Sequence, residues 1–167
     1  KIKKVTDHIS VDVVHPDMLR DGWTVANDDA GGTGDRQFGL PDVREIYLRD
    51  DPNISGRVTV HILWDKQKNT IVSNESSEII RMFNSAFNGL TGNDLDFYPP
   101  ALQADMEPIN GRIYDTFNNG VYRCGFSTTQ AAYNAAVVPL FETLNWLEDH
   151  LASNRYLMGH QLTEADC

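Results

Sequence analysis

The first half of the chain mixes the two-residue period of strands with the longer period of helices. Apolar and polar positions alternate over residues 8–16 ("HISVDVVHP"), which predicts a strand that ends at a proline. Residues 17–40 are rich in Gly, Asp and Asn, and this composition predicts a long loop or insertion. Apolar positions at helical spacing predict a short helix over residues 40–51, with Pro41 suited to its first turn.

Two β-rich runs follow, residues 57–65 and 69–74, and the polar "KQK" between them predicts a hairpin. A helix is predicted next, because apolar residues recur on one face; they are Ile79, Ile80, Phe83 and Phe87. Four polar residues in a row, "NESS" at 74–77, separate the strand from this helix. They stand where the first amides of a helix lack intrahelical acceptors.

The second half of the chain is predicted to be all-helical. Residues 89–100 carry the Gly, Asn, Asp and Pro of a linker. From residue 101 to 154 no run favours a strand, and two long helical segments are expected, joined near Ser127. Pro139 is expected to bend the second segment. We therefore expect one domain over residues 1–88 and another over residues 101–167.

Composition excludes several classes of partner and site. A net charge of −10 and a pI near 4.7 argue against nucleic acid and anionic membranes, which need a basic surface. The chain has no apolar run long enough to span a bilayer and no signal-peptide pattern, so a cytoplasmic protein is expected. Cys124 and Cys167 lie far apart without metal-ligand spacing, which predicts neither a disulfide scaffold nor a metal site.

Both ends of the sequence predict interrupted elements. The opening "KIKKV" resembles the interior of a helix. Near the other end, Thr163 and Asp166 have the spacing of a capping box, which marks a helix start. We therefore expect an internal piece of a longer protein.

Several stretches together resemble the glutathionyl-hydroquinone reductases, the Xi-class glutathione transferases. They are "VVHPDMLRDGW", "GRVTVHILWD", "IVSNESSEIIRMFNSAF", "YPPAL", "IYDTFNNGVYRCGF" and "RYLMGHQLTEAD". The resemblance runs over essentially the whole chain, and "NNGVY", "GRVTV" and "NESSEII" separate it from other glutathione transferases. It implies part of an α/β thioredoxin-like domain, with a loop insertion at about 17–40, followed by part of an all-α glutathione-transferase domain.

The family reaction implied by this resemblance is a thiol exchange. A cysteine thiolate takes glutathione from a glutathionyl-hydroquinone, and a second glutathione resolves the mixed disulfide. The family nucleophile belongs to a Cys-Pro-Trp motif that this sequence does not contain, so no catalytic residue is assigned here. The resemblance also implies a homodimer. Two alternatives stay open: a non-catalytic or degenerate glutathione-binding remnant, and a transferase that conjugates electrophiles.

The resemblance assigns Glu75 and Ser76 to the γ-glutamyl end of glutathione. The Glu75 carboxylate would meet the ammonium group, and the Ser76 hydroxyl and amide would meet the carboxylate. Plain helix capping explains the same residue types, with Asn74 or Ser76 as the cap and Glu78 favourable in the first turn.

Three further residues are expected at glutathione by resemblance. The backbone of Val60 would pair with the cysteinyl part, and the next residue, His61, takes the place of the family's cis-proline. The Val60–His61 bond is accordingly either cis or trans with a displaced strand end. Arg57 would bind a carboxylate or carbonyl group, and Trp23 would cover the peptide. The alternatives are a solvated Arg57 at the start of a strand and a Trp23 that closes the core.

The resemblance assigns Tyr122 to the acceptor site, where its phenol would hold the hydroquinone oxygen. Tyr114 and Phe126 share its helical spacing, so a buried aromatic stripe explains the same pattern. Cys124 is expected to be an inert buried thiol, because no basic setting beyond Arg123 is evident.

Overall fold

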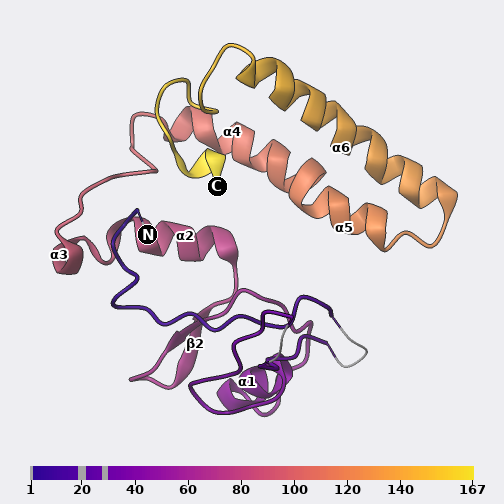
Figure 1. Cartoon of the computed structure of the whole chain (residues 1–167). Helices are drawn as coiled ribbons and strands as arrows, with labels where there is room; N and C mark the ends of the chain where they lie inside the picture. The colour runs from indigo at the N-terminus through magenta and orange to yellow at the C-terminus, as the bar shows by residue number, and fades with distance from the viewer. Residues whose placement is uncertain (1, 19–21, 28–29) are drawn as a thin grey trace. The chain divides into compact units, whose positions relative to one another are not determined.

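The computed structural model describes residues 2–18, 22–27 and 30–167. The chain forms two compact units, Lys1–Asp94 and Leu95–Cys167, and each is described by itself (Figure 1). No helix within the described ranges is long and apolar enough to cross a membrane.

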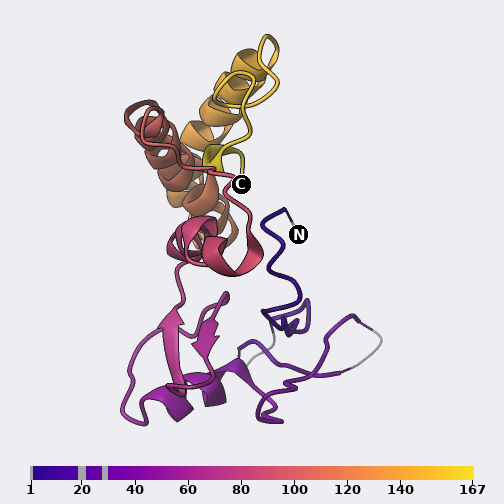
Figure 2. The ribbon, with the colours of Figure 1, turned by 90° about the vertical axis from the view of Figure 1, so that its left-hand side faces the viewer.

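The first unit places one helix against a hairpin. Helix α1, Val43–Asp50, confirms the helix predicted over residues 40–51, although Pro41 precedes the N-cap instead of lying in the first turn. Strands β1, Leu63–Asp65, and β2, Thr70–Ser73, pair antiparallel and confirm the predicted hairpin. Figure 2 shows this hairpin beside α1, with which β2 is in contact.

The strand predicted over residues 8–16 is wrong, since this described segment forms no regular strand. Its backbone bonds go to two separate segments: the His15 amide donates to the Thr24 carbonyl at 2.9 Å, and Val13 accepts from the Thr33 amide at 3.0 Å. The Val13 amide donates to a side chain, the Thr33 hydroxyl, at 2.8 Å. Because the partners change along the segment, no continuous ladder develops.

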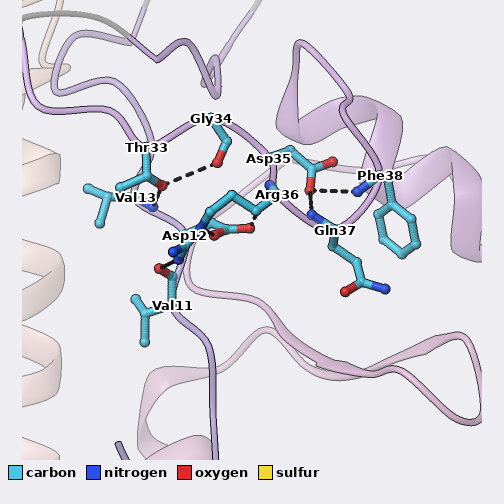
Figure 3. A network of polar contacts seen from close by, with 9 residues as sticks. All are labelled: Val11, Asp12, Val13, Thr33, Gly34, Asp35, Arg36, Gln37 and Phe38. Atoms are coloured by element: carbon cyan, nitrogen blue, oxygen red, sulfur yellow. Dashed lines mark hydrogen bonds and ion pairs between the residues drawn. The ribbon is translucent and has the colours of Figure 1, made fainter. Parts of the chain in front are cut away.

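The predicted loop over residues 17–40 is tied to residues 11–13 at its second end (Figure 3). Part of that prediction, residues 19–21 and 28–29, lies outside the described residues. Arg36 pairs with Asp12, Nε to Oδ1 at 2.6 Å, and also donates to the Val11 carbonyl. The Asp35 carboxylate accepts from the amides of Gln37 and Phe38, at 2.9 and 3.0 Å. These contacts give the described part of the loop a defined turn.

The strand expected from residue 57 is shorter than predicted, because β1 begins only at Leu63. Residues 57–62 have strand-forming composition but no ladder partner among the described residues. The Thr59 carbonyl accepts a bond from the Tyr47 phenol instead, at 2.9 Å. Arg57 therefore lies in an irregular segment and not at a strand end.

The core of the first unit lies around α1. Val25, Val43 and Tyr47 are buried there. Half-buried apolar side chains pack against them; these are Val14, Trp23, Val58, Val60, Ile62 and Ile71. Helix α2, Ser76–Ser85, and the short helix α3, Asn88–Thr91, follow the hairpin. The predicted α2 is confirmed, but none of its residues is buried within the described structure.

The second unit is built on two long antiparallel helical segments (Figure 1). The first consists of α4, Gln103–Ile113, the π-helix η1, Tyr114–Asn118, and α5, Asn119–Gly125. The second is α6, Gln130–Leu151, in contact with α5 and η1. Residues 101–154 are all described and hold no strand, which confirms the all-helical prediction.

The two segments are joined by a close approach and by a buried polar contact. Gly120 lies against Leu140: a Cβ at this position would be 3.4 Å from Leu140 Cδ1, an ordinary van der Waals distance. Thr143 is only 1% exposed, and its hydroxyl accepts from Arg112 Nε at 3.2 Å. The Arg112 guanidinium also lies over the Trp146 ring, 4.3 Å from its centroid. The polar groups in this packing are therefore paired.

Of the two elements predicted at the ends of the sequence, the one near residue 163 is confirmed and the one at the start is not. The capping box is confirmed: the Thr163 amide donates to the Asp166 carboxylate at 2.9 Å, at the start of the 3₁₀ helix η2, Glu164–Asp166. The helical reading of "KIKKV" is wrong for residues 2–5, which form turns; Lys1 lies outside the described residues. Lys3 Nζ donates to the Asn93 carbonyl at 3.0 Å, which ties this segment to a distant residue.

Candidate functional site

The junction between β2 and α2 is organised by a buried serine. Ser73, 8% exposed, accepts from the Glu75 amide at 3.1 Å and donates to Glu78 Oε2 at 2.9 Å. Glu75 occupies the N-cap position without a side-chain capping bond. The predicted caps, Asn74 and Ser76, are therefore wrong: no described side chain caps the first turn, and the Ser73 hydroxyl binds the amide of the N-cap residue Glu75 itself. Sequence reasoning missed Ser73 because it belongs to the strand.

The first turn of α2 presents open hydrogen-bond donors. The amides of Ser76 and Ser77 donate to no acceptor in the part of the chain that the structure describes. Glu75 and Ser76 are exposed, and the carboxylate of Glu75 is likewise not held by another described residue. A helix N-terminus attracts a carboxylate, and a neighbouring acid attracts an ammonium group. The two features side by side suit the α-amino acid end of a ligand.

Asn74 takes part in a polar chain that crosses the first unit. Its Nδ2 donates to the Tyr47 phenol at 3.1 Å, and the phenol donates to the Thr59 carbonyl at 2.9 Å. Tyr47 is 4% exposed. The sequence signal for this link was a tyrosine on the apolar face of α1, because a buried phenol usually finds a partner. The chain connects the residue before Glu75 with the residue before Val60.

The structure places Trp23 and Val60 against the same core cluster. Both are half-buried and pack against the cluster of Val25, Val43 and Tyr47. The core interpretation of Trp23 is thus supported, and a part of its side chain stays accessible. The alternative left open at the next peptide bond is resolved, since Val60–His61 is cis.

Arg57 is not joined to these residues. It is exposed, and its guanidinium forms no hydrogen bond or ion pair within the ranges that the structure describes. It lies three residues before Val60 and offers an uncompensated positive charge in an acidic protein.

Tyr122 lies on α5 in the second unit. It is 66% exposed and stacks on Phe126, with ring centroids 6.5 Å apart and an interplanar angle of 8°. Phe126 and Tyr114 are exposed as well. This stripe is therefore not part of the core of this chain.

Neither cysteine has the setting of a nucleophile. Cys124 is half-buried and Cys167 is exposed, and both are free thiols. Burial, with the nearby carboxylates of Asp166 and Glu164, raises the pKa of the Cys167 thiol. Over the described residues, no group of three or more His, Cys, Asp or Glu side chains is arranged to hold a metal ion.

Comparisons with known proteins agree on one family. The family profile described as glutathione S-transferase, C-terminal domain, matches residues 130–167. The chain is 54% identical to glutathionyl-hydroquinone reductase YqjG of Escherichia coli, over 99% of this chain and 51% of that protein. It is 46% identical to glutathionyl-hydroquinone reductase PcpF of Sphingobium chlorophenolicum, over 99% of this chain and 52% of that protein.

Solved structures give the same result. The glutathione-bound structure of YqjG matches with a TM-score of 0.91, covering 96% of this chain and 52% of that one. Glutathione transferase Xi 1 from Trametes versicolor matches at 53% identity with a TM-score of 0.94, covering 99% of this chain and 59% of that one. Over nearly its whole length the chain is similar to Xi-class glutathione transferases.

The likeness to these solved structures confirms the predicted fold class. The first unit is the thioredoxin-like part, and the second is the all-α glutathione-transferase part. The chain spans about half the length of the curated relatives that it matches.

Proposed function

We propose that the protein containing this chain is a glutathione-dependent reductase that removes glutathione from glutathionyl-hydroquinones. The observation that carries the proposal is the identity, over 99% of the chain, to two proteins named as glutathionyl-hydroquinone reductases. The nucleophilic cysteine of the implied reaction lies outside this sequence. The chain's own contribution is to bind glutathione and to orient the acceptor.

In this proposal the glutathione site uses residues of the first unit. The Glu75 carboxylate holds the γ-glutamyl ammonium group, and the Ser76 hydroxyl and amide bind the neighbouring carboxylate. The backbone of Val60 pairs with the cysteinyl part, Arg57 binds a carboxylate or carbonyl, and Trp23 covers the peptide. The open first turn of α2 supports the first two roles.

In the second unit, Tyr122 binds the hydroquinone oxygen. Its exposure and its stacking on Phe126 support this role, since a flat aromatic surface suits an aromatic ring. The ring face of Tyr122 would contact the acceptor ring while its phenol forms the hydrogen bond.

Glutathione affinity tests the binding half of the proposal. Replacing Glu75→Ala in the complete protein removes the partner of the ammonium group. We expect the Kd for glutathione, measured by calorimetry, to rise at least tenfold, which corresponds to about 1.4 kcal/mol. Ser77→Ala is the matched control, because Ser77 is exposed on the same turn and has no assigned role. Unchanged affinity in Glu75→Ala contradicts the role given to Glu75.

A competition between two reactions tests the catalytic half. The complete protein is offered a glutathionyl-hydroquinone and, separately, an electrophile that glutathione transferases conjugate. We expect a higher kcat/KM for release of the hydroquinone. Preference for conjugation would overturn the reductase proposal, and a reading frame without a Cys-Pro-Trp motif would favour a non-catalytic remnant.

The proposal also covers the domain bounds, the assembly and the compartment of the protein. We propose a thioredoxin-like glutathione-binding domain over residues 1–88, a linker over 89–100 and the acceptor domain over 101–167, in a cytoplasmic homodimer. Sedimentation of the complete protein at micromolar concentration tests the assembly, and a monomer would contradict it.

A further inference from the structure

We propose that Tyr47 is a positioning residue for glutathione, linking the two backbone segments that bind its γ-glutamyl and cysteinyl parts. The proposal rests on the glutathione site proposed above. Tyr47 itself touches no ligand in this arrangement; it acts through Asn74 on one side and Thr59 on the other.

The geometry places Tyr47 between two residues that immediately precede the proposed ligand contacts. Asn74 precedes Glu75, and its amide donates to the Tyr47 oxygen at 3.1 Å. Thr59 precedes Val60, and its carbonyl accepts from the same oxygen at 2.9 Å. One phenol oxygen is therefore acceptor for one segment and donor to the other.

The anchor of this link is rigid. The Tyr47 ring is 4% exposed and belongs to α1, where it packs with Val25 and Val43. Segment 57–62 has no ladder partner among the described residues, so the Thr59 carbonyl accepts its hydrogen bond from a side chain, the Tyr47 phenol. Without the phenol, segment 57–62 loses this hydrogen bond to α1, and the position of Val60 relative to Glu75 is no longer fixed by it.

A second contact between α1 and the hairpin supplies a control that distinguishes an effect on ligand positioning from an effect on stability alone. Asp50, at the end of α1, accepts from the Thr70 hydroxyl at 2.6 Å and from the Ile71 amide at 2.8 Å. This contact joins α1 to β2 at the end of the strand away from Glu75. Loss of the Thr70 hydroxyl therefore removes a side-chain hydrogen bond between α1 and the hairpin, here one to a carboxylate, without touching either ligand segment.

The test compares three variants of the complete protein: Tyr47→Phe, Asn74→Ala and the control Thr70→Val. Tyr47→Phe breaks both hydrogen bonds of the phenol, and only part of their free energy is expressed in ligand binding; an effect equal to one net hydrogen bond corresponds to about a fivefold change in an equilibrium constant. We expect Tyr47→Phe to raise the Kd and the KM for glutathione about fivefold, with kcat within about twofold of the wild type. Asn74→Ala should act in the same direction, and the double variant should be no worse than Tyr47→Phe alone, because both changes break one link.

Thermal unfolding is measured beside binding. We expect Thr70→Val to lower Tm while leaving the Kd for glutathione unchanged. The inference is overturned if Tyr47→Phe binds glutathione like the wild type, or if Thr70→Val weakens binding as much. If Glu75→Ala weakens binding while Tyr47→Phe does not, the proposed function stands and only the positioning role fails. A wild-type protein that does not bind glutathione defeats both.

Discussion

Ser73 is the residue whose removal most directly tests how the β2–α2 junction is built. Ser73→Ala deletes a hydroxyl that accepts from the Glu75 amide at 3.1 Å and donates to Glu78 Oε2 at 2.9 Å. The lost amide bond resembles the loss of a helix cap, and Glu78 is exposed, which reduces the value of the second bond. Together they amount to about 1–2 kcal/mol for the first turn of α2.

Amide hydrogen exchange measures that loss where it occurs. The Ile79 amide donates to the Glu75 carbonyl at 3.0 Å, so its exchange reports opening of the first turn. A cost of 1–2 kcal/mol predicts roughly fivefold to thirtyfold faster exchange of Ile79 in Ser73→Ala. The Ala86 amide, which donates to the Met82 carbonyl at 2.9 Å, lies at the other end of the helix and should change little.

A matched substitution separates the hydroxyl bond from a general effect of Ser-to-Ala changes. Ser77→Ala makes the same chemical change at an exposed position of the same turn. It should leave the exchange of Ile79 within about twofold, because no described partner of that hydroxyl is lost. Equal rates in Ser73→Ala and Ser77→Ala would refute the assignment of Ser73 as the organiser of the junction.

Two further predictions concern the hairpin turn and the helical unit. The amides of Lys68 and Gln67 donate to the Asp65 carboxylate and hold its pKa below the ordinary value. The ionised Asp65 side chain should therefore stabilise the turn above about pH 4, and this stabilisation should be lost as the pH falls through the lowered pKa. A carboxyl titration by NMR checks this, and Asp65→Asn should keep the turn without the pH dependence. Thr143→Val removes a buried acceptor of Arg112 and should destabilise the second unit by about 1–3 kcal/mol in urea unfolding; an unchanged midpoint would contradict that.

Helices were predictable from the sequence because their signals are local. The apolar spacing that predicts α1 and α2 is complete within each segment, and both form where expected. The same holds for α6. Strands were harder, because a strand needs a hydrogen-bonded neighbour as well as a favourable composition. Residues 8–16 and 57–62 have that composition, but their partners are irregular or come from a side chain.

The residue types of the candidate site were predictable from the sequence, but the hydrogen bonds between them were not. The polar run before α2 indicated a helix start, and the helix begins there. The sequence did not predict that Asn74 would bond to Tyr47, 27 positions away, or that Ser73 would hold the Glu75 amide while no described side chain caps the first turn. Exposure was also unpredictable for Tyr122, because helical spacing places a residue on a face without saying what covers that face.

The proposed glutathione contacts differ in how far they are fixed before the ligand arrives. Ser73 holds the Glu75 amide and Tyr47 holds the Thr59 carbonyl, so the backbone at both positions is already ordered. Arg57 has no such support within the described residues, and binding must order a long side chain at a cost of up to about 2 kcal/mol. A preorganised contact loses less entropy on binding. Discrimination between ligands is therefore expected mainly at the γ-glutamyl and cysteinyl parts, while Arg57 supplies a local positive charge in a protein of net charge −10.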